Sequence, residues 1–207
     1  DLIVSRGLGD VYKRQVSQTL TTFVGEGVDH ILPGGLDHIL FVLALFLSST
    51  TSRSLVIQIS VFTLAHTITL GLAATGVISP PSDIVEPLIA LSIALVAIEN
   101  LFFKKPPRWR PIVIFLFGLL HGLGFAGFFG ELGLPEGQFW SALIGFNIGV
   151  EIGQLSVIIL AIAVLSVWRW RNNIEYTDVV YRRFMILPGS LLTVSYTHLR
   201  AHETRSD

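Results

Sequence analysis

The stretch "VDHILPGGLDHILFVLALFL", from Val28 to Leu47, places two Asp-His pairs ahead of a long apolar run. A Pro-Gly-Gly break at residues 33–35 separates the pairs, and almost nothing polar follows Asp37 and His38. Pro and Gly interrupt regular structure, so the break predicts that a helix begins just after it. The Asp-His pair then requires an explanation, because ionisable groups are costly inside a bilayer.

The whole chain is rich in apolar residues. Its 207 residues are 51% hydrophobic and only 14% charged, whereas a soluble domain carries about 25% charged residues. We therefore predict an all-α fold, a polytopic bundle of transmembrane helices. The absence of cysteine from the sequence excludes disulfides and thiolate metal ligands.

Six apolar segments define the predicted spans. A spanning helix needs about 20 residues. The first segment is shorter than this, the fifth is longer, and the sixth ends early, as a truncated last helix would. The segments are residues 35–48, 55–74, 84–103, 111–129, 139–168 and 184–192.

The two ends of the chain differ in composition from the interior. Both resemble translated sequencing-adapter read-through, so we expect residues 1–15 and 194–207 to be non-native tails. The expected transmembrane domain is residues 16–193. This excludes His198 and His202 from any predicted site.

Lys and Arg alternate strictly between the predicted loops. Loops after the first, third and fifth segments hold all the basic residues of the expected domain, and the other loops hold none. Under the positive-inside rule, this pattern predicts a multi-pass membrane protein with its N-terminal side outside and its first loop in the cytoplasm. The basic residues are Arg53, Lys104, Lys105, Arg108, Arg110, Arg169, Arg171, Arg182 and Arg183.

The four histidines of the expected domain all lie in or beside predicted spans. His30 lies just outside the first predicted helix and His38 in its first turn, while His66 and His121 lie within the second and fourth segments. An ionisable residue at membrane depth is by default a functional candidate.

The predicted depths of the polar residues agree with one another. A helical rise of 1.5 Å per residue places His66, His121 and Asn147 roughly 12–14 Å below the outer surface. Asp37 lies above them, and Glu151 lies one turn deeper. The sequence therefore predicts a polar column that opens outward and narrows with depth.

The fifth segment has two distinct faces. Asn147, Glu151 and Gln154 are spaced i, i+4 and i+7, so they share one face. Three glycines form a ridge almost opposite, which predicts close packing on a neighbouring helix. They are Gly145, Gly149 and Gly153; Gly118 and Gly122 flank His121 in the same way.

Simpler roles exist for each polar residue taken alone. A histidine can hydrogen-bond a neighbouring helix, and Asp37 can serve only as a helix cap. Glu99 is expected to form a structural pair with Lys104 or Arg108. The joint placement of these residues on several helices nevertheless favours a site.

The chemistry of this set suits a metal ion. Imidazole nitrogen and carboxylate oxygen without sulfur fit Ni²⁺, Co²⁺ or Zn²⁺ and argue against Cu(I). The sequence has no zinc-protease motif, no nucleophile elbow and no phosphate-binding loop. We therefore expect a protein that is not an enzyme.

Five motifs across residues 16–192 resemble the HupE/UreJ family, specifically its second branch. They are "HILPGGLDHILFVLALFL", "FTLAHTITLGLA", "VEPLIALSIALVAIEN", "FGLLHGLGFAG" and "FNIGVEIGQL". The resemblance implies a polytopic membrane protein linked with hydrogenase and urease accessory functions, and nickel uptake is the usual proposal for the family.

The resemblance also implies a set of metal-site residues. Asp37 and His38 would capture the ion, with His30 at the entrance; here His30 precedes Asp37 by seven positions, one more than in the family signature. The deeper positions are His66, His121, Asn147 and Glu151. The expected partners are the lipid bilayer, a divalent metal ion such as Ni²⁺ and metalloenzyme maturation proteins, with no nucleic acid and no tightly bound cofactor.

Two other functions remain open from the sequence. His66 and His121, at matching depth, could be the axial ligands of a haem in an electron-transfer protein. Alternatively, the chain could be a non-transporting assembly partner in which the polar column serves only helix packing.

Overall fold

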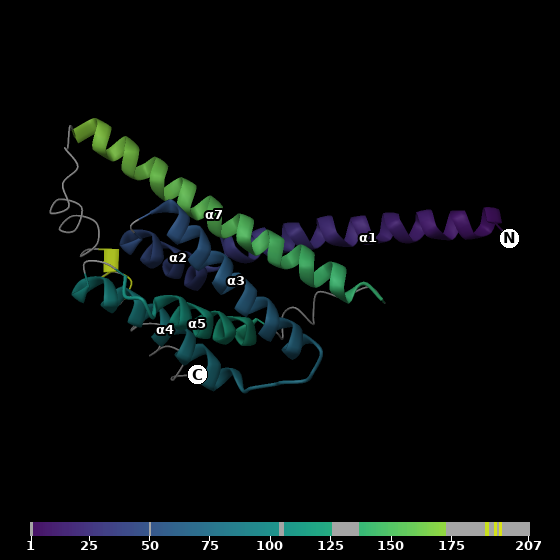
Figure 1. Cartoon of the computed structure of the whole chain (residues 1–207), viewed down its shortest axis with the longest axis horizontal. Helices are drawn as coiled ribbons and strands as arrows, with labels where there is room; N and C mark the ends of the chain where they lie inside the picture. The colour runs from purple at the N-terminus through teal and green to yellow at the C-terminus, as the bar shows by residue number, and fades with distance from the viewer. Residues whose placement is uncertain are drawn as a thin grey trace.

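A computed structural model describes residues 2–49, 51–103, 106–125, 137–172, 189–190, 193 and 195. Within these residues the fold is all-helical, as Figure 1 shows. The helices are α1 (Leu2–Ile31), α2 (Leu36–Ser48), α3 (Ser52–Ala74), α4 (Ser82–Phe102), α5 (Arg110–Gly124) and α7 (Phe139–Asn172).

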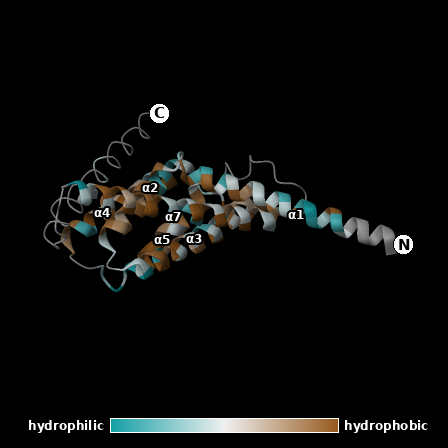
Figure 2. Ribbon diagram, turned by 90° about the horizontal axis from the view of Figure 1, so that it is seen from above, coloured by the Kyte–Doolittle hydropathy of each residue, from teal (hydrophilic) through white to brown (hydrophobic). Residues whose placement is uncertain are grey.

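Several helices are long and apolar enough to cross a membrane. Three meet this test alone: α3, α4 and the part of α7 from Phe139 to Trp168; α1 and α2 meet it together as one bent pair. α5 is a shorter apolar helix of 15 residues. Large apolar side chains such as Leu64, Leu91 and Ile159 face outward, and Figure 2 shows how widely apolar residues cover these helices. The predicted all-α membrane bundle is confirmed.

Four predicted segments, residues 35–48, 55–74, 84–103 and 139–168, correspond closely to α2, α3, α4 and α7. The end of the fourth predicted segment and most of the sixth lie outside the described residues. The described basic residues Arg53, Arg108 and Arg110 line one common pocket, so two of the predicted basic loops meet at the same end of the bundle. The orientation in the membrane stays a prediction.

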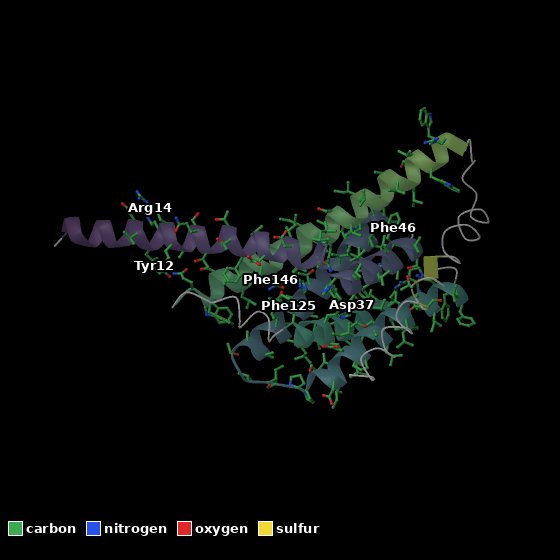
Figure 3. The ribbon with its side chains drawn as sticks, turned by 180° about the vertical axis from the view of Figure 1, so that it is seen from behind. Tyr12, Arg14, Asp37, Phe46, Phe125 and Phe146 are labelled. Carbon is green, nitrogen blue, oxygen red and sulfur yellow. The ribbon has the colours of Figure 1, made fainter. Side chains whose placement is uncertain are left out.

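Helix α1 was not predicted. His30 does precede α2, which corresponds to the first predicted helix, but it lies within a helix of its own and not in a connecting segment. His30 lies in the last turn of α1, and the chain bends by 73° between α1 and α2. α1 lacks a long apolar run, so hydropathy gave no signal for it. Residues 9–15 are exposed, and Tyr12 and Arg14 lie on the part of α1 that projects from the bundle in Figure 3.

The glycine ridge of α7 holds α1 in place. A Cβ atom on Gly145 would meet the backbone of Leu20, and one on Gly153 would meet the side chain of Ile31. The two helices therefore run parallel in backbone contact, as small-residue ridges allow. Ile31, the last residue of α1, lies beside Gly153, which follows Asn147 along α7. The break after α1 therefore lies inside the bundle and not at its outer end.

We predict that Gly149→Val will detach α1. A Cβ at this position would collide with the carbonyl of Val24 and lie 2.9 Å from the Cα of Gly27. Overpacking of this kind destabilises by about 1–3 kcal/mol, or about 2–4 °C in melting temperature for each kcal/mol. Thermal unfolding in detergent measures the shift. The matched control is Ala163→Val on the exposed face of α7; equal melting temperatures for both variants would contradict the packing described here.

Helices α3 and α5 are in similarly close contact. A Cβ on Gly118 would meet the backbone of Phe62, and one on Gly122 would meet the backbone of His66. Thr69 Oγ1 also donates a hydrogen bond to the Leu119 carbonyl at 2.8 Å. The glycines that flank His121 are therefore packing residues, and they bring its helix against the helix of His66.

A buried ion pair joins α4 to α5 near the basic end. Arg110 lies 3.4 Å from the Glu99 carboxylate and donates to the Asn100 side chain at 3.3 Å. Asn100 in turn donates to the Ala44 carbonyl of α2 at 2.8 Å. Glu99 does form a structural pair, but its partner is Arg110 rather than the predicted Arg108, because the basic residue at the start of α5 is buried against α4. The other predicted partner, Lys104, lies outside the described residues.

Candidate metal centre

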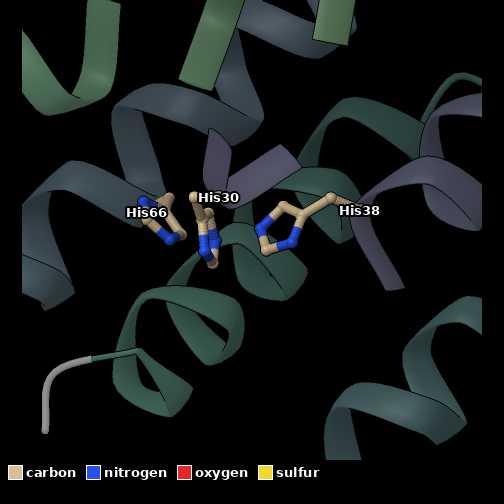
Figure 4. Close-up of side chains that lie close together, drawn as sticks. All are labelled: His30, His38 and His66. Atoms are coloured by element: carbon tan, nitrogen blue, oxygen red, sulfur yellow. The ribbon is translucent and has the colours of Figure 1, made fainter. Parts of the chain in front are cut away.

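Four histidines from four helices converge in the interior. They come from the last turn of α1, the first turn of α2, the middle of α3 and the last turn of α5. The His38 ring centroid lies 4.8 Å from that of His30, 5.8 Å from that of His66 and 5.2 Å from that of His121. Figure 4 shows three of these rings, those of His30, His38 and His66, grouped together.

Three of the rings already have nearly the spacing of metal ligands. One nitrogen from each of His30, His38 and His66 lies within 4.8 Å of the other two. Nitrogen ligands at about 2.0–2.1 Å from a tetrahedral ion are about 3.4 Å apart. Small side-chain rotations would therefore close this group around one ion. In the parts of the chain that the structure describes, it is the one group of three or more His, Asp or Glu side chains with this spacing.

The free nitrogens of the cluster are its main chemical feature. Nε2 of His30, His38, His66 and His121 is buried in every case and has no hydrogen-bond partner. Leaving a buried polar atom unsatisfied costs about 1–3 kcal/mol. Unsatisfied nitrogens gathered in one small region suit a metal cation, which accepts nitrogen lone pairs. His30, His38 and His66 form the group described above, and His121 lies beside it, with its ring centroid 5.2 Å from that of His38.

Two hydrogen bonds orient the rings for this role. His121 Nδ1 donates to the Phe117 carbonyl at 2.8 Å, which leaves the lone pair on Nε2. His66 Nδ1 lies 3.3 Å from Asn147 Oδ1, and the Asn147 amide donates to the Leu143 carbonyl at 2.8 Å. The amide oxygen therefore faces His66 as an acceptor. Metal-binding imidazoles are commonly fixed by such bonds through the other ring nitrogen.

The two predicted site residues on α7, Asn147 and Glu151, bond to side chains of α3 and not to the free nitrogens of the cluster. Asn147 contacts His66 from the side away from its free nitrogen. Glu151 accepts a hydrogen bond from Ser60 Oγ at 2.6 Å, and Gln154 accepts one from Thr63 at 3.0 Å. These bonds form a polar ladder between α3 and α7. Sequence reasoning missed the two hydroxyl residues, although they stand six and three positions before His66 on the same helix.

A cavity of about 410 Å³ adjoins the cluster. His30, His38 and His121 line it, together with Gly34 and Gly35 at the break between α1 and α2. Non-helical backbone at membrane depth is tolerated where it lines a water-filled cavity. Asp37, the predicted capture residue, also lines this cavity and lies in the body of the bundle in Figure 3.

These observations define a class: a helical membrane protein whose buried histidine cluster could hold a metal ion. The chain belongs to the HupE/UreJ family, because the family model described as "HupE / UreJ protein" matches residues 9–203. The resemblance seen in the five motifs is thereby confirmed. No curated protein and no solved structure matched the chain.

Proposed function

We propose that this protein binds a divalent transition-metal ion at the four-histidine cluster and passes it across the bacterial inner membrane. The observation that carries the proposal is the set of four buried Nε2 atoms without partners, supplied by four different helices. Imidazole sites without sulfur suit Ni²⁺, Co²⁺ and Zn²⁺. Membership of the HupE/UreJ family favours Ni²⁺, delivered for the assembly of hydrogenase or urease.

The break between α1 and α2 supports a transport role. Interrupted helices place binding groups near the middle of the membrane in many transporters. Here His30 and His38 lie on the two sides of the break. Beyond the cluster, the ladder between α3 and α7 supplies oxygen atoms from Ser60, Thr63 and Glu151. We propose that this ladder is the onward path of the ion, and that the protein has no enzymatic activity.

The geometry favours a metal ion over haem. The His38 ring lies close to both His66 and His121, with ring centroids 5.8 and 5.2 Å away. A porphyrin held between His66 and His121 would have to displace that ring. A cluster that served only helix packing would also be expected to pair its buried nitrogens, since unpaired ones destabilise the fold.

Metal binding and uptake test the proposal together. The purified chain in lipid nanodiscs is dialysed against Ni²⁺ and its metal content measured; we expect about one ion per chain and no Soret absorption band. Proteoliposomes should then take up Ni²⁺. A chain that binds no ion contradicts the proposal, and a Soret band would favour the haem alternative. Binding without uptake would identify an accessory protein rather than a permease.

A further inference from the structure

The cavity beside the four-histidine cluster has only acidic residues among its charged lining. Glu26 and Asp29 come from α1, Asp37 from α2 and Glu86 from α4. Its other lining residues are histidines, glycines and apolar residues, and the described lining includes no Lys or Arg. Four carboxylates from three helices therefore border one space of about 410 Å³.

The inner wall of the cavity independently indicates a cationic ligand. His38 and His121 both line it, although their side chains are only 6% and 2% exposed. Each has a buried Nε2 atom without a hydrogen-bond partner. The acidic space is therefore bordered by histidines whose Nε2 atoms have no hydrogen-bond partner.

We propose that this cavity is a vestibule that admits the metal as a free hydrated divalent cation, not as an anionic chelate, and that Glu86 is a capture residue within it. This inference rests on the proposed metal-binding function. It adds Glu26, Asp29 and Glu86 to the residues that handle the ion. Sequence reasoning noted Asp29 only as the neighbour of His30, and it passed over Glu26 and Glu86, because nothing in their spacing links them to the histidines.

Charge explains why carboxylates stand here. Four neutral imidazoles bind an ion but leave its double positive charge uncompensated, which is unfavourable in a bilayer. Nearby carboxylates offset that charge, and they raise the local concentration of cations while repelling anions. A metal held in an anionic carrier would meet the same repulsion.

The size of the cavity fits a hydrated ion. Six water molecules at about 30 Å³ each occupy about 180 Å³, which is less than half of the space present. Carboxylate oxygens suit an ion that keeps its water shell, whereas imidazole nitrogen suits a transition metal that has lost it. The ion would thus meet carboxylates in the vestibule while it still holds its water shell, and imidazoles in the cluster after it has lost that shell.

The rate of Ni²⁺ binding tests this inference. Protein in uncharged phosphatidylcholine nanodiscs is mixed with Ni²⁺ in a stopped-flow instrument, with a competing metal indicator as the reporter. We expect Glu26→Gln/Glu86→Gln to bind about tenfold more slowly at low ionic strength, because it lacks part of the attracting field. The difference should shrink as salt shortens the screening length from about 30 to about 8 Å, and the equilibrium stoichiometry should stay unchanged.

A matched control lies on the same helix. Asp83 is exposed in the first turn of α4 and does not line the cavity, so Asp83→Asn removes one carboxylate from this end without altering the vestibule. Its binding rate should fall much less than that of the double variant, because its carboxylate lies outside the vestibule. Wild-type protein should also take Ni²⁺ from a preformed citrate complex more slowly than as the free ion.

The possible results separate the two proposals. If the double variant binds Ni²⁺ as fast as Asp83→Asn at low salt, the vestibule proposal is overturned, but the proposed metal binding at the four-histidine cluster is not affected. Equal rates for free Ni²⁺ and its citrate complex would overturn the selection of the free ion. If the wild type binds no Ni²⁺ at equilibrium, the proposed function fails and the vestibule with it. Should the double variant not fold, Glu86→Gln alone, at an exposed position, supplies the comparison.

Discussion

Alanine in place of His38 is expected to lower the equilibrium affinity for Ni²⁺ by more than 100-fold. His38 is the residue whose ring lies near each of the other three histidines, at centroid distances of 4.8 to 5.8 Å. Its removal therefore takes away a ligand from the middle of the cluster. The measurement is equilibrium dialysis of the variant in nanodiscs against graded concentrations of Ni²⁺.

Asn147→Leu supplies a graded comparison for His38→Ala. Asn147 contacts His66 through the ring nitrogen that faces away from the cluster, so it positions a ligand without binding the ion. Loss of such a residue typically lowers metal affinity about 10–100-fold, and His38→Ala should exceed that range. His38→Asn, which preserves a polar side chain, guards against misfolding of the alanine variant. Undiminished affinity in a folded His38 variant would contradict the four-histidine centre.

Leucine in place of Glu99 is expected to destabilise the fold by about 3–5 kcal/mol, the usual effect of removing one member of a buried ion pair. Arg110 is only 2% exposed and would lose the carboxylate that lies 3.4 Å away. Its charge would then be buried without an opposite charge. Unfolding of the variant in mixed detergent micelles, followed as the denaturing detergent is increased, gives the change in stability.

The double variant Glu99→Leu/Arg110→Met separates the buried charge from the lost contact. Replacing both members of a buried pair by apolar residues is often neutral or stabilising, so most of the lost stability should return. Arg108→Met, at an exposed position two residues away, should change stability by less than about 0.5 kcal/mol. If the double variant were as unstable as Glu99→Leu alone, the unpaired charge would not be the cause.

The apolar helices could be predicted from the sequence because lipid selects for them directly. Segments that contact lipid must be long and apolar, so hydropathy finds α3, α4 and α7. Hydropathy does not detect α1, because α1 carries charged residues such as Glu26 and Asp29, which line a cavity. Its position depends on contact with the glycines of α7, and a glycine ridge predicts a neighbour without saying which helix it is.

The candidate site, like the fold, could be predicted from the sequence only in part. The similar depths of His66, His121 and Asn147 follow from helical rise, and the structure brings these helices together as expected. The inward position of His30 could not be foreseen, because it depends on a helix that hydropathy does not detect. Helical spacing also places Asn147 and Glu151 on one face without revealing that hydrogen bonds to His66 and Ser60 occupy them.

The glycine contacts have a consequence for how constant the spacing of the cluster remains in a fluid bilayer. Exposed side chains change rotamer within nanoseconds, but two backbones in van der Waals contact cannot approach further. His30 is carried by one such pair, α1 on α7, and His66 and His121 by another, α3 on α5. The bond between His66 and Asn147 links the two pairs. The distances between these histidines are thus set largely by close backbone packing, and we expect them to vary little with the thickness or composition of the surrounding lipid.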